Sequence, residues 1–280
     1  MNVEDFNFIS QLLYRRSGLV LNQEKAYLLE SRLSPVARKW NFGGFEELVS
    51  TIISGADEPL LNAVTEAMTT NESFFFRDQK PFDQFRDVVM PHLLDSRAAA
   101  RKIRIWSAAC SCGQEAYSLA MILSEMSGLL AGWQIEILAT DLSNETLTKG
   151  RQGLYSQFEV QRGLPINLLM KYFVQEGEKW KIKDSLREMV TFQRFNLLTD
   201  PKPLGKFDVV FCRNVLIYFD QDTKARVLQA LSTVMPEDGF LYLGGAETVL
   251  GISERFQIYP GHRGIYAPAP ETAQPTRAVI

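Results

Sequence analysis

Residues 102–126, KIRIWSAACSCGQEAYSLAMILSEM, decide the fold class. The first seven residues are mostly apolar and predict a buried strand, and the apolar residues after Glu115 recur at helical spacing. The same order returns along the chain, with strands predicted at 133–141, 207–214, 240–245, 255–259 and 264–267 and helices after Ser143 and at 223–235. Alternating strands and helices indicate a doubly wound, mostly parallel α/β sheet.

The chain before this sheet is helical in pattern and predicts an all-helical N-terminal domain. Ser17 and Gly18 are expected to end its first helix, and Pro35 is expected to end or kink its second. Three successive phenylalanines, residues 74–76, are expected to enter the core of this bundle.

One stretch, about residues 155–195, breaks the strand–helix alternation. Within it, KWKIK at 179–183 and MVTFQRF at 189–195 predict strands of a small antiparallel insert. The predicted boundaries are 1–76 for the helical domain, 77–100 for a linker helix, 101–268 for the α/β domain with its insert and 269–280 for a disordered tail rich in Pro, Ala and Thr.

Composition excludes several classes of protein. The 280 residues are 46% hydrophobic and 22% charged, as in ordinary globular proteins. No apolar run approaches the about 18 residues that a membrane span needs. A net charge of −3 argues against a general nucleic-acid binder.

The cysteine content and the N-terminus bear on the compartment. Three cysteines are too few for a disulfide framework, and the acidic N-terminus lacks a signal-peptide pattern, so a reducing cytoplasm is expected. Cys110 and Cys112 are too close for a usual zinc ligand pair and no histidine supports them, so no metal site is predicted.

Ligands of open α/β sheets bind beyond the carboxyl ends of the strands, so the residues that follow strands are candidates for a site. Small residues at 107–113 allow close approach to the backbone, although a tight turn without a ligand explains them equally well; they are not a dinucleotide fingerprint. Asp141 follows the second strand and is placed to bind ribose hydroxyls or, alternatively, to cap the next helix. The small-residue loop at 107–113 and Asp141 together favour an adenosine-containing cofactor. Arg213, Asn214 and Tyr218 follow the third strand at the same rim.

These segments resemble a known family. TTNESFFFRD (69–78), SAACSCGQEAYSLAM (107–121), ILATDLS (137–143), RFNLL (194–198) and FDVVFCRNVLIYFD (207–220) stand in the order and spacing of the bacterial chemotaxis-receptor glutamate methyltransferases, the CheR family. The resemblance extends to about residue 267. It implies the class I S-adenosylmethionine methyltransferase type of fold and methyl transfer to glutamate side chains of methyl-accepting chemotaxis receptors. The products would be glutamate methyl esters, which tune receptor adaptation, and S-adenosylhomocysteine.

The resemblance also implies site residues. Those that would bind the cofactor are Asn71, Ser73, Arg77, Glu115, Asp141, Asn196, Leu197, Arg213 and Asn214. It places Arg77 and Tyr218 near the transferred methyl group, where they would position an acceptor carboxylate. The sequence departs from the family at Ser73, where threonine is usual, and at CSCGQEAYS, where STGEEPYS is typical; Cys112 removes a hydroxyl and Gln114 a charge.

The partners implied are the cytoplasmic domains of the receptors, with the enzyme cytoplasmic and recruited to receptor arrays, without membrane insertion or nucleic acid. The second helix offers a basic set for glutamate-rich receptor faces, unless these side chains form a solvated face: Lys25, Arg32, Arg38 and Lys39. Family members that bind a receptor C-terminal pentapeptide have a longer, glycine-containing loop in the insert. The connection around Gly177 is short, so pentapeptide binding is not expected.

Two other functions stay open. The chain could methylate another protein or a small-molecule carboxylate, or bind the cofactor without catalysis as a regulator. Retention of Arg77 and Tyr218 argues against the regulator, because binding alone does not require them. The helical N-terminal domain argues for a macromolecular substrate.

Overall fold

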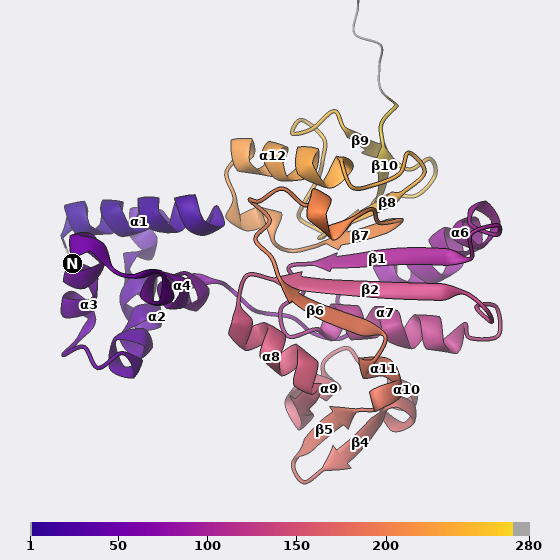
Figure 1. The fold of residues 1–280 in the computed structure, drawn as a ribbon, viewed down its shortest axis with the longest axis horizontal. Helices are drawn as coiled ribbons and strands as arrows, with labels where there is room; N and C mark the ends of the chain where they lie inside the picture. The colour runs from indigo at the N-terminus through magenta and orange to yellow at the C-terminus, as the bar shows by residue number, and fades with distance from the viewer. Residues whose placement is uncertain (1, 271–280) are drawn as a thin grey trace, which may run out of the picture.

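The computed structural model describes residues 2–270 and contains a helical bundle joined to an α/β domain (Figure 1). The bundle consists of α1 (Val3–Ser17), η1 (Gln23–Lys25), α2 (Ala26–Lys39), α3 (Phe45–Gly55) and α4 (Glu58–Met68). Its core contains Ile9, Leu13, Leu29 and Leu33, all fully buried. These residues recur at helical spacing, so burial of one apolar face per helix holds the bundle together.

Two helix-end predictions in the bundle have different outcomes. The helix α1 ends at Gly18, whose left-handed φ of 75° suits a residue without a Cβ, so this prediction is confirmed. Of the two effects predicted for Pro35, that it ends the second helix or kinks it, the first is wrong, because α2 continues to Lys39. Pro35 and Ser31 lie on the exposed face, where water can satisfy the carbonyl of Ser31 that a proline cannot bond, while Leu33 and Val36 keep the opposite face in the core.

The segment after the bundle is helical with one irregular turn. It comprises α5 (Lys80–Gln84), the π-helical turn η2 (Phe85–Val89) and α6 (Met90–Ser96). Pro91 has no N–H to bond the carbonyl of Asp87 in α-helical fashion, and the wider π-helical turn lies just before it.

The main sheet has seven strands within the described residues, in the order β6-β2-β1-β7-β8-β10-β9. The bounds are β1 (Lys102–Ala108), β2 (Gln134–Asp141), β6 (Val190–Arg194), β7 (Val209–Cys212), β8 (Phe240–Leu243), β9 (Phe256–Ile258) and β10 (Ile265–Pro268). The first five in spatial order are parallel, and β10 is antiparallel to both of its neighbours. The predicted doubly wound, mostly parallel sheet is therefore present.

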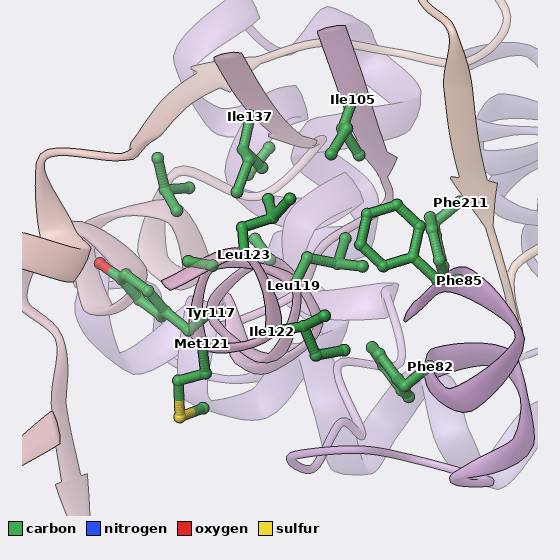
Figure 2. Close-up of a cluster of buried hydrophobic side chains, with 14 of the residues drawn as sticks. Phe82, Phe85, Ile105, Tyr117, Leu119, Met121, Ile122, Leu123, Ile137 and Phe211 are labelled. Carbon is green, nitrogen blue, oxygen red and sulfur yellow. The ribbon is translucent and has the colours of Figure 1, made fainter. Parts of the chain in front are cut away.

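Helices cover both faces of this sheet. They are α7 (Gln114–Glu125), α8 (Asn144–Gln152) and α12 (Gln221–Ser232), with η3 (Lys202–Leu204) and η4 (Leu216–Tyr218) in loops. Figure 2 shows the core on the α7 side, where Ile105, Ile137 and Phe211 of neighbouring strands point toward α7 and toward Phe82 and Phe85. Alternate strand residues such as Trp106 and Val210 enter the second core, under α12. Both faces are buried, which explains why these strands are almost wholly apolar.

A second, three-stranded sheet forms the insert. Its elements are β3 (Leu154–Ser156), α9 (Gln157–Gln161), α10 (Ile166–Tyr172), β4 (Phe173–Glu176), β5 (Lys179–Ile182) and α11 (Asp184–Arg187), with strand order β3-β5-β4. All its pairings are antiparallel. The prediction that the strand at 189–195 belongs to this insert is wrong, because β6 pairs in parallel with β2 in the main sheet.

The predicted tail falls almost entirely on residues 271–280, which lie outside the described residues. Within residues 2–270, none of the helices is long and apolar enough to cross a membrane.

Candidate active site

One pocket lies where several parallel strands end. The segments that follow β1, β2, β6 and β7 form one side of it, and the bundle closes the other through Ser17, Leu19 and the connection at 69–73. In Figure 1 the carboxyl ends of β1 and β2 face the indigo bundle. The chain leaves the neighbouring strands β1 and β7 in opposite directions, so this is the switch point at which such sheets bind ligands.

The structure brings together all the residues that the sequence singled out. The lining of this one pocket includes Asn71, Ser73, Arg77, Glu115, Asp141, Asn196, Leu197, Arg213, Asn214 and Tyr218. They come from five separate stretches of the chain, and the sheet topology places those stretches at one edge.

Asp141 is the buried acid of the pocket. Its Oδ2 accepts the N–H of Ser111 at 2.9 Å and its Oδ1 accepts the N–H of Ser143 at 3.0 Å. Burial raises the pKa of Asp141, and these backbone N–H groups oppose the rise. The helix cap weighed above as the alternative is supplied by Ser143, whose hydroxyl accepts the N–H of Thr146. A carboxylate has about four acceptor positions, so after two backbone bonds it can still accept ribose hydroxyls.

Arg213 forms a buried cationic centre below the pocket. Its side chain is 1% exposed, and it donates to Glu115 Oε2 at 2.9 Å and to Asp78 Oδ2 at 2.7 Å. It also donates to the carbonyl oxygen of Arg77 at 2.8 Å. Glu115 in turn accepts the hydroxyl of Ser107 at the end of β1. Arg213 therefore ties the end of β7 to the segment that carries Arg77.

The connection from the bundle supplies a second wall. Arg32 of α2 donates to the carbonyl oxygens of Met68 and Thr69, which fixes the end of α4, and the hydroxyl of Ser111 donates to the carbonyl oxygen of Asn71. Arg77 donates to the carbonyl oxygen of Glu72 at 3.0 Å. The same segment then leads into the core.

The prediction that the phenylalanines of this segment enter the bundle core is wrong. Phe75 and Phe76 are buried in the core of the α/β domain, and Phe75 packs edge-on against Tyr155 with ring centroids 5.1 Å apart. Phe74 lies under the guanidinium groups of Arg77 and Arg162. The segment thus anchors the pocket wall to the insert.

The loop after β6 holds the bundle against the pocket. Asn196 donates through Nδ2 to the carbonyl oxygen of Arg16, and its Oδ1 accepts the N–H of Leu198. Its side chain is therefore engaged within the protein. Leu197 is half-buried and packs against the core under α12.

Strained backbone gathers around the pocket. Non-glycine residues with a left-handed φ include Ala109 (60°), Ser111 (51°) and Asn214 (59°), and Phe76 and Asp78 share this conformation. Such residues cost free energy and persist only where surrounding contacts fix them, as they are at functional sites.

An adenosine-containing cofactor fits this pocket. Asp141 lines the pocket, and the small residues Ala109 and Ser111 leave the backbone of the loop after β1 accessible. Within the described chain, Arg213 Nε is buried without a hydrogen-bond partner, so polar capacity is left under the pocket.

The cysteines near the pocket are packed thiols. Cys110 and Cys212 are buried, and burial raises the pKa of both thiols well above the usual range, so they stay protonated. Within residues 2–270, there is no group of three or more side chains arranged to hold a metal ion.

The sheet, its switch-point pocket and the buried acid together are typical of a doubly wound α/β protein that binds a nucleoside-containing ligand. Comparison with known proteins makes this specific. The family model "CheR methyltransferase, SAM binding domain" matches residues 71–265, and "CheR methyltransferase, all-alpha domain" matches residues 4–69. The chain belongs to the CheR methyltransferase family, and its cofactor is S-adenosylmethionine.

Relatives agree over nearly the full length. The chain is 36% identical to "Chemotaxis protein methyltransferase 1" of Vibrio cholerae over 267 residues, which cover 94% of this chain and 95% of that protein. It is 38% identical to "Chemotaxis protein methyltransferase 1" of Pseudomonas aeruginosa over 267 residues, or 93% and 96% of the two chains.

Sequence reasoning missed two carboxylates at the site. Asp78 pairs with Arg213, and Glu247 accepts backbone N–H groups of the loop that carries Asn214. Both had a visible signal: Asp78 closes the FFFRD segment, and Glu247 follows the predicted strand at 240–245, at the same edge as the other candidates.

Proposed function

We propose that this chain transfers the methyl group of S-adenosylmethionine to glutamate side-chain carboxylates of methyl-accepting chemotaxis receptors. The observation that carries this proposal is that Arg77 and Tyr218 line the same pocket as Asp141 and Glu115. A pocket with cofactor-binding groups and two positioning groups suits transfer better than binding alone. The names of the relatives support a chemotaxis substrate.

The proposed mechanism needs orientation and no general base. S-adenosylmethionine, when bound, supplies a methyl group on a positively charged sulfur that a carboxylate attacks directly. A glutamate acceptor is already ionised at neutral pH, so no side chain has to remove a proton. The two histidines agree with this, because His92 packs on Phe240 and His262 stacks on Tyr259, and neither lines the pocket.

The residues of the pocket divide into two groups in this proposal. The cofactor is held by Asn71, Ser73, Arg77, Glu115, Asp141, Asn196, Leu197, Arg213 and Asn214. The guanidinium of Arg77 pairs with the incoming carboxylate and the hydroxyl of Tyr218 donates to it, which aligns the attacking oxygen and excludes water. Asn196 contributes through its backbone, because its side chain is bonded to Arg16 and Leu198.

The proposal assigns the receptor to the helical domain. Residues 1–76 face the receptor, 77–100 connect, and 101–268 contain the insert and most of the residues that hold the cofactor, while Asn71, Ser73 and Arg77 reach the pocket from the first two segments. Lys25, Arg38 and Lys39 are exposed and remain available to a glutamate-rich receptor helix, whereas Arg32 caps α4. Because the substrate is the cytoplasmic part of a membrane receptor, the enzyme acts in the cytoplasm at receptor arrays.

The decisive experiment is incubation with radiolabelled cofactor and receptor cytoplasmic domains, scored as methanol released by base. Base-labile methanol marks a carboxyl ester, and a receptor with its methyl-accepting glutamates changed to alanine is the control. Label that is stable to base, or label on the control receptor, would contradict the proposal. Receptor-independent transfer to small carboxylates would favour the small-molecule alternative.

Charge reversal tests the receptor-facing surface. The double change Arg38→Glu and Lys39→Glu is expected to raise KM for the receptor several-fold and to leave the affinity for S-adenosylhomocysteine unchanged, because both side chains are exposed away from the pocket. Glu30→Gln, on the same exposed helix, is the matched control. An unchanged KM in the double variant would move the receptor contact elsewhere.

A further inference from the structure

The loop that carries Asn214 and Tyr218 is held by one carboxylate from the segment that follows β8, the next strand of the sheet. Glu247 lies four residues beyond the end of β8. Its Oε2 accepts the N–H of Asn214 at 2.8 Å and that of Gly244 at 2.6 Å. Its Oε1 accepts the N–H of Ile217 at 3.2 Å, at the 3-10 turn that ends in Tyr218.

These bonds fix a backbone that would not hold its shape alone. Asn214 has a φ of 59°, a conformation that non-glycine residues adopt only with support. A Cβ on Gly244 would lie 2.9 Å from the backbone nitrogen of Asn214 and 2.7 Å from Glu247 Oε2, so the close approach of the two segments favours glycine there. The segment after β8 therefore fixes the loop after β7 in two ways. The carboxylate of Glu247 binds the backbone of that loop, and Gly244, which has no side chain, leaves room for it.

The chemistry of the cluster requires a carboxylate. All three of its partners are N–H donors, and a carboxylate is an acceptor at both oxygens. A glutamine would keep one accepting oxygen and turn an NH₂ donor toward at least one of these N–H groups. Glu247→Gln therefore keeps the size and shape of the side chain and replaces one of its two acceptor oxygens with a donor.

We propose that Glu247 is a positioning residue for methyl transfer. It acts through Asn214 on the cofactor and through the turn at Ile217 on the phenol of Tyr218. The part that concerns Tyr218 rests on the proposed function. The part that concerns Asn214 does not, because it can be measured on cofactor binding alone.

The binding test uses S-adenosylhomocysteine and calorimetry. Glu247→Gln is expected to weaken binding about threefold to tenfold in the natural background and to have less than a twofold effect in an Asn214→Ala background. Glu254→Gln, at an exposed glutamate between β8 and β9, is the matched control and is expected to bind normally. Equal losses in both backgrounds would show that Glu247 does not act through Asn214 and would overturn this part.

The catalytic test is a double-mutant cycle with Tyr218→Phe, measured as single-turnover methyl transfer with receptor and cofactor saturating. Glu247→Gln is expected to slow transfer about tenfold when Tyr218 is present and less than twofold when it is replaced. A purely structural role would lower the melting temperature and give additive losses, which would overturn the proposal. If receptor is not a substrate of the natural enzyme, the proposed function fails while the binding test still decides the role of Glu247.

A second variant covers loss of folding. If Glu247→Gln is unfolded by circular dichroism, Gly244→Ala replaces it, because the added Cβ would lie within 3.0 Å of both Glu247 Oε2 and the backbone nitrogen of Asn214 and would push the two apart, while Glu247 keeps both of its acceptor oxygens. The same non-additive pattern with Asn214→Ala is expected, and additive losses would again overturn the proposal.

Discussion

Burial gives Asp141 its properties at the cofactor pocket. Removal from water raises the pKa of its carboxyl, and the N–H groups of Ser143 and Ser111 oppose this by stabilising the ionised form. Those two bonds also hold the loop after β1 and the start of α8 in place. The residue therefore shapes the pocket and presents the remaining acceptor positions to a ribose.

Replacement of Asp141 tests this dual role. Asp141→Ala is expected to weaken binding of S-adenosylhomocysteine by about 1.5–3 kcal/mol, the scale of hydrogen bonds to a charged group. In the natural enzyme the affinity is expected to be constant at neutral pH and to fall as the pH drops through the raised pKa of Asp141, because protonation removes an acceptor. Asp141→Asn should lose this acid limb. Calorimetry across pH measures both, and an unchanged affinity in Asp141→Ala would end the ribose assignment.

Arg77 and Tyr218 allow a contrast between two positioning residues. Tyr218→Phe and Arg77→Ala are both expected to lower turnover while the fold survives, because both groups orient and neither reacts. Only Arg77→Ala is expected to weaken cofactor binding as well, because Arg77 is assigned to the cofactor and to the acceptor carboxylate, whereas Tyr218 is assigned to the carboxylate alone. Receptor methylation rates and calorimetry separate the two effects. Full activity of Tyr218→Phe on receptor would remove its role.

The site residues that could be predicted from the sequence share one property. They follow a strand or stand in a motif, as Asp141 and Arg213 do, so position in the chain reveals them. Glu247 also follows a predicted strand, so its position could have marked it, but its role could not be predicted, because it binds the backbone N–H groups of Asn214 and Ile217, which lie about 30 residues earlier in the chain. Asp78 ends the motif at residues 69–78, but its partner Arg213 lies 135 residues further along the chain, and only the folded structure brings the two together.

At the scale of elements, the position of β6 shows why a strand can be recognised and still be misplaced. Its residues alternate between buried and exposed, as in an antiparallel strand with one wet face. The strand instead lies at the edge of the parallel sheet beside β2. An edge position leaves part of the strand in contact with solvent and produces the same alternation, so the sequence pattern does not separate the two cases.

At the amino ends of the parallel strands, opposite the pocket, one arginine links several elements. Arg97, just after α6, donates to Asp208 Oδ1 at 2.8 Å and to both oxygens of Asp238 at 2.6 and 2.7 Å. Asp208 also accepts the N–H of Arg104 in β1. This arrangement joins α6 to the starts of β7 and β8.

Arg97→Ala is therefore expected to lower the free energy of unfolding by about 2 kcal/mol, the scale of charged hydrogen bonds that are partly solvated. The bond to Arg97 lowers the pKa of Asp238, so this stability is present above the ordinary aspartate pKa and is lost as the pH falls through the lowered value. Urea unfolding at neutral and acidic pH measures it. Arg86→Ala, which breaks exposed pairs with Asp83 and Asp87, should cost less than about 1 kcal/mol. Equal losses for the two variants would contradict the prediction.

At the scale of the whole molecule, the helical bundle is part of the cofactor pocket. The N–H of Val20 donates to the carbonyl oxygen of Tyr218 at 3.0 Å, and Glu66 of α4 accepts the N–H of Asn144 at the start of α8. Sequence patterns indicated both halves of the molecule. They did not indicate this docking, because it joins groups that lie far apart in the chain. The half that is proposed to meet the receptor thus touches the loop that carries Tyr218.

The insert bears on whether the molecule has a second receptor contact. Lys179 and Lys181 do not guard an edge of the small sheet, because their strand β5 lies between β3 and β4. The two edge strands are β3, which is three residues long, and β4, which is four residues long and ends in Glu176. An added peptide strand draws its affinity from main-chain bonds along such an edge, so a short edge offers few.

We therefore expect no binding of a receptor C-terminal pentapeptide that contains Trp and Phe. Glu176 and Glu178 place negative charge beside the turn at Gly177, where a peptide carboxylate would be repelled, although Lys181 pairs with Glu176 at 3.3 Å and offsets part of that charge. Calorimetric titration with the pentapeptide is expected to give no heat of binding, and a receptor that lacks its last five residues is expected to be methylated as fast as the full receptor. Micromolar binding together with slower methylation of the shortened receptor would show that β4 accepts a strand and that the helical bundle is not the only receptor contact.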